Sequence, residues 1–417
     1  MAKTDLIAGL DIGSGKVTCV LGTLEPDGSG LRILSGASIP CRGVKGGVVI
    51  NIKETAHAIR QAVEKAEAES AGSVVQGVYL GVRGKHLESY NNRGAYNIAR
   101  TDKEITAEDV RAVIENAKAI PISNDREILH VIPQGFALDR QRGVPDPVGM
   151  EGSLLEVEVH IVTALSSHLN NLTKAVAEAG FDVLEPIYSA LALGELVVTP
   201  EERELGALLV DLGGHSVTLA IYGEGAIRFS KELPIGTEAI TGDLAHALRT
   251  NFQVAERMKL EHGVAHPRLA AEGDAEVDYL GVDGRTPRKT SGKTMLSIVV
   301  PRIEETFSLI AQEVRNSPFA DVAMGSGAIL SGGGAMLRGM PEAGEQILEM
   351  SVRLGLVPPG VVSAPQKFFD DATFTTAMGL VRYPVTTMRE TVRREQGARK
   401  TDPRWLRKAR GMFQEIF

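Results

Sequence analysis

Cysteine is nearly absent from this sequence: its 417 residues include two, Cys19 and Cys41. Two cysteines cannot form the disulfide framework that stabilises small secreted domains, so a reducing compartment is favoured. No run approaches the ~20 consecutive apolar residues that cross a bilayer. The opening MAKTDLIAGLDIG also lacks the basic and apolar regions of a secretory signal peptide. We therefore expect a cytosolic chain without a membrane-spanning helix.

Aromatic residues and net charge are also scarce. Phe, Trp and Tyr together make up 5% of the chain, and the formal net charge is -8. This balance gives no overall basic field, which argues against a general nucleic-acid binder. An apolar content of 43% excludes a disordered chain. At roughly 150 residues per domain, the length predicts two to four domains.

The charge is unevenly distributed along the chain. The segment from Arg389 to the end carries nine basic and four acidic residues, a net charge of +5, which leaves -13 on the rest. An acidic body with a short basic tail suggests two functions in two places.

The most informative internal feature is a duplicated hairpin. Residues 5–24 contain a buried strand, a Gly-Ser-Gly turn and a second strand. Residues 205–222 repeat this pattern, and alignment of the two segments superposes Asp11 on Asp211.

Two Asp-Gly hairpins that face each other across a cleft can hold a triphosphate. Glycine lets backbone N–H groups approach phosphate oxygens, and each aspartate can position a hydrated magnesium ion. A single motif of this kind is weak, because such turns occur in many β-proteins. The pair, followed by the SGGG turn at 331–334, predicts a nucleotide cleft.

The sequence GSGK at 13–16 is not a Walker phosphate loop. The preceding glycine, Gly9, is one residue too early, and Val17 stands where serine or threonine is required. A strand follows the turn, so phosphates cannot sit on a helix N-terminus. Lys16 either contacts a phosphate or is a solvated hairpin lysine.

The ordered motifs resemble the actin–Hsp70–sugar kinase superfamily. GLDIGSGKV resembles its first phosphate loop, LLVDLGGHS its second and AILSGGGAMLRG its adenosine loop. Within that superfamily the chain is similar to the FtsA family of bacterial cell-division proteins. That similarity extends through ILHVIPQGFALD, DPVGMEG, LEVEVHIVTA, AERMKLEHG and the amphipathic C-terminal segment. It implies an α/β chain with a duplicated actin-like (ribonuclease H-like) ATPase fold, an inserted α+β subdomain and a C-terminal amphipathic helix.

The resemblance also implies a division into subdomains. The expected parts are a first actin-like domain at 1–83 and 162–200, an inserted α+β subdomain at 84–161, a second actin-like domain at 201–241 and 321–388, its upper subdomain at 242–320, a flexible basic linker at 389–403 and a membrane-targeting helix at 404–417.

By the same resemblance the cofactors are ATP and magnesium, the metal being held through water by Asp11 and Asp211. The residues expected to contact the nucleotide are Asp11, Gly13, Ser14, Gly15, Lys16, Asp211, Gly213, Gly214, Glu256, Lys259, Gly332, Gly333 and Gly334. Glu256 and Lys259 lie three residues apart on one helical face, over the ribose and base. The alternative for this pair is an exposed ion pair.

Glu185, in EPIYSALALG, matches an acid that opens a helix in Hsp70-like relatives. There it helps to order the attacking water or the water shell of the metal. Helix N-termini also favour glutamate through the helix dipole alone. A catalytic role and a purely structural one therefore remain as alternatives.

The C-terminal segment predicts an amphipathic helix. Asp402 is a suitable N-cap and Pro403 a suitable first helical residue. At 100° per residue, an arc of about 140° contains the apolar side chains, which are Trp405, Leu406, Met412, Phe413, Ile416 and Phe417. Basic side chains flank or oppose this face; they are Arg404, Arg407, Lys408 and Arg410.

This pattern fits an anchor on a membrane of anionic lipid, where each basic residue contributes about 1 kcal/mol. The alternative is a helix that docks on the body of the protein. One short helix binds a membrane weakly, so firm attachment would need many copies on a polymer.

The resemblance implies a protein that polymerises on the cytoplasmic face of the inner cell membrane at the division site, as a peripheral protein. Its implied partners are the C-terminal peptide of FtsZ, other copies of itself, anionic membrane lipid and later division proteins that bind 84–161; no nucleic acid is expected. The FtsZ peptide would dock on the upper subdomain, where Arg302 either pairs with it or lies on a solvated helix face. Residues 84–161 are alternatively a stabilising insertion. ATP is expected to act mainly as a conformational ligand, with at most slow hydrolysis.

Three other functions share this fold. A sugar or metabolite kinase needs a general base and substrate loops, and has no use for a basic amphipathic tail. An Hsp70-like chaperone needs a peptide-binding domain, for which no room remains after about residue 388. A pilus-assembly relative is the nearest competitor, and the C-terminal anchor argues against it.

Overall fold

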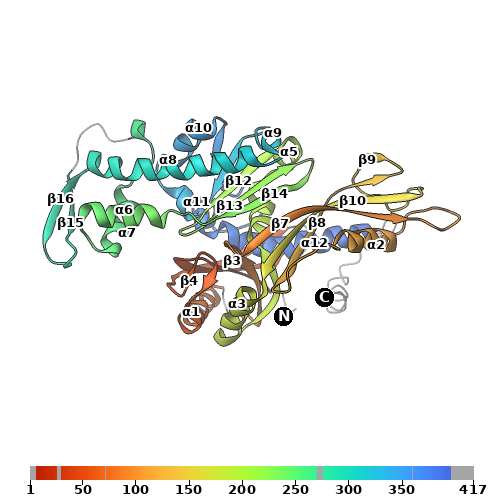
Figure 1. Ribbon diagram of the computed structural model, residues 1–417. Helices are drawn as coiled ribbons and strands as arrows, with labels where there is room; N and C mark the ends of the chain where they lie inside the picture. The colour runs from red at the N-terminus through yellow and green to blue at the C-terminus, as the bar shows by residue number, and fades with distance from the viewer. Residues whose placement is uncertain (1–5, 26–29, 71, 270–275, 359, 396–417) are drawn as a thin grey trace.

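A computed structural model describes residues 6–25, 30–70, 72–269, 276–358 and 360–395. Two α/β domains form the body, and an inserted sheet extends from it on the side opposite the β15–β16 hairpin (Figure 1). The residues of the expected membrane-targeting helix, 404–417, lie outside the described part of the chain.

The first domain is built on a five-stranded sheet in the order β11-β6-β1-β2-β3. Its strands are β1 (Leu6–Ile12), β2 (Lys16–Leu24), β3 (Leu31–Pro40), β6 (Gly77–Val82) and β11 (Asp182–Tyr188). Helices α1 (Ile52–Glu69) and α3 (Ser166–Ala179) pack together on one face. Helices α4 (Ser189–Val197) and α12 (Thr375–Glu395) pack together on the other. A two-stranded hairpin of β4 (Val44–Lys45) and β5 (Val48–Val49) precedes α1.

The second domain repeats this plan in the order β14-β13-β12-β17-β18. Its strands are β12 (Ala207–Leu212), β13 (Val217–Gly223), β14 (Ala226–Leu233), β17 (Ala328–Ser331) and β18 (Val352–Leu354). Its shorter helices are α5 (Pro200–Leu205), α9 (Ala320–Ala323) and α10 (Met340–Leu348). The short helix α11 (Lys367–Asp370) lies against the first domain, where Lys367 pairs with Glu69 of α1. The predicted duplication and actin-like fold are confirmed, because each sheet has an antiparallel hairpin beside two parallel strands.

The insertion has its own sheet in the order β7-β10-β8-β9 and its own hydrophobic core. Its elements are β7 (Leu87–Asn97), α2 (Ala107–Ala117), β8 (Arg126–Leu138), β9 (Gln141–Val144) and β10 (Leu154–Leu165). Although most of its residues are polar, β7 is a long strand. Gly94 lets α2 lie directly on this strand, since a Cβ there would be 2.3 Å from the carbonyl oxygen of Val113.

The upper subdomain consists of α6 (Glu238–Leu248), α7 (Phe252–His262), a β15 (Glu276–Leu280) and β16 (Pro287–Ser291) hairpin, and α8 (Gly292–Asn316). The sequence pattern predicts one helical region over 238–262, but the structure has two helices. Arg249 adopts the left-handed conformation (φ 51°) and ends α6, and the Asn251 side chain caps α7.

Helix α12 runs to Glu395. Residues 389–395 are therefore helical, where a flexible linker was expected over 389–403. Within the ranges given above, no helix is both long and apolar enough to cross a bilayer.

Candidate functional site

The two glycine turns have the same backbone geometry. The Gly13 N–H donates to the Lys16 carbonyl at 2.9 Å, and the Gly213 N–H donates to the Ser216 carbonyl at 3.0 Å. A Cβ on Gly213 would lie 2.7 Å from that same Ser216 oxygen, so a side chain there would disrupt the turn. At Gly15 and Gly214 the space is open, because a Cβ added at either would have no atom within 4 Å. Both turns therefore leave backbone accessible to a ligand.

Asp11 and Asp211 are the next-to-last residues of the first strand of each hairpin, and one arginine joins them. The two terminal nitrogens of Arg83 lie 2.7 Å from Asp11 Oδ1 and 2.9 Å from Asp211 Oδ2. Burial opposes the charged guanidinium, but Asp11, Asp211 and Glu232 together raise the pKa of Arg83. Burial raises the pKa of Asp211, which Arg83 partly offsets. Sequence reasoning missed Arg83.

The third glycine loop closes over the second turn. Gly332 has φ 80°, and a Cβ on it would lie 2.2 Å from Asp211 Oδ1. A Cβ on Gly334 would lie 2.5 Å from the Thr237 side chain and 2.9 Å from the Leu212 carbonyl oxygen. Gly332 and Gly334 therefore pack against the end of the strand that leads into the second glycine turn, and the expected contact of Gly332, Gly333 and Gly334 with a nucleotide stays a prediction.

Glu256 and Lys259 form an ion pair at 2.8 Å on α7. The pair is not a surface one, because Lys259 is buried and also donates to Thr241 Oγ1 at 2.9 Å and weakly to the Thr237 carbonyl. Thr241 in turn donates to the Glu256 carboxylate. This network fixes α7 against α6 beside the third glycine loop.

Lys16 begins β2 and is partly buried. Burial lowers its pKa, while the carboxylates of Asp371, Asp11 and Glu256 oppose that shift. These acids come from both domains, so the Lys16 ammonium lies within their combined field. Lys16 is therefore not a freely solvated lysine, and its contact with a phosphate stays a prediction.

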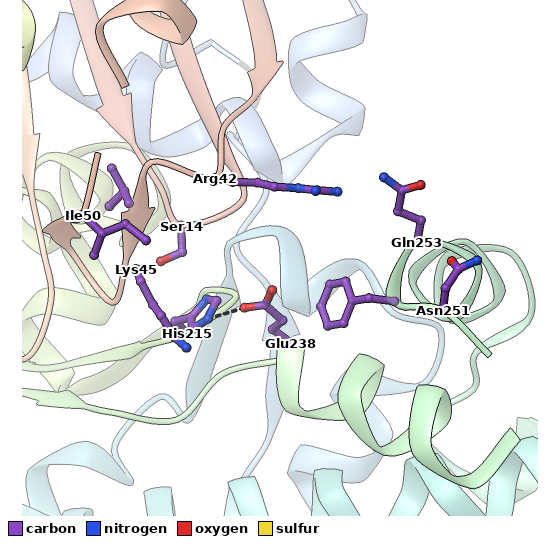
Figure 2. A pocket seen from close by; sticks show the side chains of 10 residues that line it. Ser14, Arg42, Lys45, Ile50, His215, Glu238, Asn251 and Gln253 are labelled. Atoms are coloured by element: carbon purple, nitrogen blue, oxygen red, sulfur yellow. Dashed lines mark ion pairs between the residues drawn. The ribbon is translucent and has the colours of Figure 1, made fainter. Parts of the chain in front are cut away.

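A cavity of about 540 Å³ opens where the two domains meet (Figure 2). Its lining residues are Ser14, Arg42, Val44, Lys45, Ile50, His215, Glu238, Asn251, Phe252 and Gln253. Ser14 comes from the first glycine turn and His215 from the second, and His215 pairs with Glu238 at the start of α6. Of these residues, the sequence patterns had indicated Ser14 alone. No sequence motif marks the basic pair Arg42 and Lys45.

The expectation that Glu185 opens a helix is wrong. Glu185 lies within β11, and α4 begins at Ser189. It pairs in register with Tyr79, which pairs with Gly9, two residues before Asp11. The backbone there is about 7 Å along and about 10 Å across the sheet from Asp11. Burial raises the pKa of Glu185 to about 7, but its catalytic role stays a prediction without geometric support.

Arg302 lies on α8 and is already paired within the chain. Its guanidinium contacts both carboxylate oxygens of Asp243, at 2.7 and 3.0 Å, and also Glu305. A partner peptide would have to compete with Asp243, so the binding role of Arg302 stays a prediction.

The groups at the cleft suit the expected ligands in part. The glycine turns, Lys16 and the open backbone fit the phosphates of a nucleotide. The carboxylates of Asp11 and Asp211 suit a hydrated magnesium ion by their chemistry, yet Arg83 contacts both of them.

Two protein-family models match the chain. The SHS2 domain inserted in FtsA matches residues 84–163, and the model of the cell division protein FtsA matches residues 208–379. Among curated proteins, the cell division protein FtsA of Pseudomonas aeruginosa is 36% identical over 91% of this chain and 89% of its own length. The FtsA of Escherichia coli (strain K12) is 32% identical over 91% and 90%.

Solved structures agree on the fold. A PilM–PilN type IV pilus biogenesis complex matches with a TM-score of 0.66 and 17% identity, covering 91% of this chain and 98% of that one. MreB5 of Spiroplasma citri bound to AMPPNP matches with a TM-score of 0.56 and 12% identity, covering 95% and 100%. Such low identity establishes the fold alone, whereas the curated relatives are more than 30% identical over nine-tenths of the chain. The chain belongs to the FtsA family of cell-division proteins.

Proposed function

We propose that this chain binds ATP in its interdomain cleft, polymerises on the cytoplasmic face of the inner membrane and tethers FtsZ filaments there. Membership of the FtsA family gives it a role in cell division. The observation that carries the finer proposal is the pair of Asp-Gly hairpins in equal register at the domain interface.

The ATP site is assembled from both domains. The turns at 13–15 and 213–214 supply backbone N–H groups for the phosphates, and Lys16 supplies a positive charge. The loop 332–334 and the buried pair Glu256–Lys259 flank the nucleoside. A neighbour with the same fold, MreB5, is itself bound to AMPPNP. When present, magnesium would neutralise phosphate charge, with Asp11 and Asp211 holding its water shell.

Nucleotide is expected to act as a conformational ligand. Its phosphates would contact turns of both domains at once, so binding favours the state in which the domains are closed. Polymer contacts that need this closed state would then depend on ATP. We expect hydrolysis to be slow at most, with the nucleotide serving mainly to set the conformation.

Membrane attachment rests on the sequence of residues 404–417. The apolar face carries the only tryptophan of the chain, and the basic residues beside it favour anionic lipid. Polymerisation would multiply these weak anchors into firm binding. The upper subdomain, 242–320, is the proposed dock for the FtsZ C-terminal peptide, and 84–161 the proposed dock for later division proteins.

Co-sedimentation with anionic liposomes, with and without Mg·ATP, tests this function. The full-length chain is expected to pellet with liposomes, and more so with ATP, while a chain truncated after residue 403 stays in the supernatant. Phe413→Glu places a charge on the apolar face and should abolish pelleting. Gln414→Glu adds the same charge outside that face, so most of the protein should still pellet with the liposomes.

Either of two results would contradict the proposal. Pelleting that survives the truncation would mean that the anchor lies elsewhere. Equal pelleting with and without ATP would mean that membrane binding does not depend on the nucleotide.

A further inference from the structure

Arg83 links the two domains next to the strands that lead into the two glycine turns. Its guanidinium lies at the end of β6 in the first domain, and it reaches Asp11 of β1 and Asp211 of β12 in the second. The side chains of both Arg83 and Asp211 are almost fully buried, at 12% and 2% exposure. This arrangement is a two-carboxylate clamp around one cation.

The backbone holds Arg83 in that position. The next residue, Gly84, has φ 114°, and its N–H donates to Glu232 Oε2 on β14 at 3.1 Å. Thr218 donates to the same oxygen. A side chain on Gly84 would lie 2.4 Å from the Gly46 carbonyl oxygen, so a larger residue does not fit at this position. Arg83 is therefore attached to the second domain through both its side chain and its neighbour.

The clamp uses the oxygens that a hydrated magnesium ion would need. Guanidinium groups bind carboxylates through paired N–H donors, whereas magnesium binds them directly or through its water shell. The two cations compete for the space between Asp11 and Asp211, because both are positive and both are bound by these two carboxylates. Asp211 Oδ1 and Arg83 Nε are buried without a hydrogen-bond partner, so the clamp leaves polar atoms unsatisfied.

We propose that Arg83 is an internal cation that competes with magnesium for Asp11 and Asp211, and that Mg·ATP binds by displacing its guanidinium. This inference rests on the ATP site of the proposed function. In the nucleotide-free protein Arg83 joins the two domains, and the metal replaces that link when the nucleotide enters.

The competition is tested by measuring the affinity of a fluorescent ATP analogue over a range of free Mg²⁺, from EDTA to millimolar. For Arg83→Gln we expect the half-maximal Mg²⁺ concentration to fall about tenfold or more, because a buried cation that must be displaced costs at least one decade in the equilibrium. The nucleotide-free variant should also melt at a lower temperature. Arg83→Lys keeps one charge without the two-pronged geometry, so it should shift the Mg²⁺ dependence by an intermediate amount.

Arg353→Gln is the matched control. Arg353 also binds a carboxylate through two nitrogens, at 2.7 Å each to Glu202, but between β18 and α5. This variant should lower the melting temperature and leave the Mg²⁺ dependence unchanged.

An unchanged Mg²⁺ dependence in Arg83→Gln would overturn the inference, and so would loss of analogue binding at every Mg²⁺ concentration, which would make Arg83 a phosphate ligand. If Arg83→Gln does not fold, Arg83→Lys decides by the same criterion. Failure of the unmodified protein to bind the analogue at any Mg²⁺ concentration would instead refute the proposed ATP site.

Discussion

Asp11 and Asp211 occupy the same rung of two separate hairpins. Asp11 lies opposite Thr18 across its hairpin, and Asp211 lies opposite Thr218. Each aspartate also has a parallel neighbour on its other side, Gly81 for Asp11 and Ser331 for Asp211. The two carboxylates therefore come from equivalent positions and meet at the domain interface. A ligand that contacts both of them would hold the two domains at a fixed distance.

Gly332→Ala should damage the site and the fold together. Its φ of 80° is a conformation that alanine rarely adopts, and the new Cβ would lie 2.2 Å from Asp211 Oδ1. We expect the free energy of unfolding to fall by about 2 kcal/mol or more, with ATP binding lost. Gly242→Ala is the control, since this exposed glycine lies within α6 with no atom within 4 Å of an added Cβ. It should stabilise the protein by up to about 1 kcal/mol, as measured by urea unfolding. Equal effects of the two variants would contradict the close contact.

Glu256→Gln should destabilise the upper subdomain. It removes the charge that balances the buried Lys259 ammonium. Loss of a charged partner from a buried cation should lower the free energy of unfolding by about 1–3 kcal/mol. Glu261→Gln is the control on the same helix, because Glu261 is 56% exposed and lies 3.8 Å from His262. It should change stability by less than about 0.5 kcal/mol. Thermal unfolding of both variants provides the comparison. If Glu256→Gln does not change the stability, the ion pair does not contribute to it.

Three buried histidines should lower stability as the pH falls below neutral. The carboxyls of Glu185 and Glu232, whose pKa burial raises to about 7, should act in the opposite direction. Burial lowers the pKa of His86, His130 and His160 to about 4 each. In the unfolded chain a histidine has a pKa near 6.5, so between about pH 6.5 and 4 the unfolded chain binds more protons than the folded one. The stabilisation is therefore complete above about pH 6.5 and is lost as the pH falls toward 4, by up to about 3 kcal/mol for each histidine.

His160→Gln isolates one of these contributions. His160 contacts Asn91 Oδ1 and Ser230 Oγ, both neutral, where the insertion meets β14. Urea unfolding at pH 7.5 and pH 5 should show a smaller difference in the variant than in the unmodified chain. His57→Gln, on the exposed face of α1, should keep the full difference. An undiminished difference in His160→Gln would place the acid sensitivity elsewhere.

Substitutions of Arg302 and of Asp243 should change the affinity for the FtsZ peptide in opposite directions, which tests the predicted FtsZ dock. Asp243 accepts hydrogen bonds from two nitrogens of the Arg302 guanidinium, at 2.7 and 3.0 Å. If Arg302 binds an acidic peptide, Asp243→Ala should strengthen binding of the FtsZ C-terminal peptide several-fold, and Arg302→Ala should weaken it by about tenfold. Fluorescence anisotropy with a labelled peptide measures both. Equal affinities for the two variants would remove Arg302 from the dock. Stability should change little in either, since a partly exposed ion pair contributes about 1 kcal/mol or less.

Local patterns predicted the parts of this chain that depend on neighbouring residues. The two hairpins follow from apolar runs on either side of glycine turns. The third glycine loop was also predictable, because Gly332 has a backbone conformation that few other residues adopt. The sequence pattern did not predict the break between α6 and α7. The left-handed residue at the break is Arg249, and only a glycine there would have indicated a helix end.

Contacts between distant segments explain the other differences. Arg83 is 72 residues from Asp11 and 128 from Asp211, and no motif surrounds it. Glu185 shares a motif with helix-opening acids, yet its pairing with β6 extends the strand through Tyr188 and delays the helix to Ser189. Strand pairing of this kind depends on the neighbouring strand, which periodicity within one segment does not contain.

The sequence by itself determined the duplicated hairpins, the positions of the glycine loops and the family, because backbone hydrogen bonding and glycine geometry act over a few residues. The tertiary structure alone decided that one guanidinium joins Asp11 to Asp211, that Lys259 is buried and that Arg302 is already paired. These outcomes depend on which charged groups meet after the domains pack, and electrostatic pairing across a buried interface leaves no periodic trace in the chain.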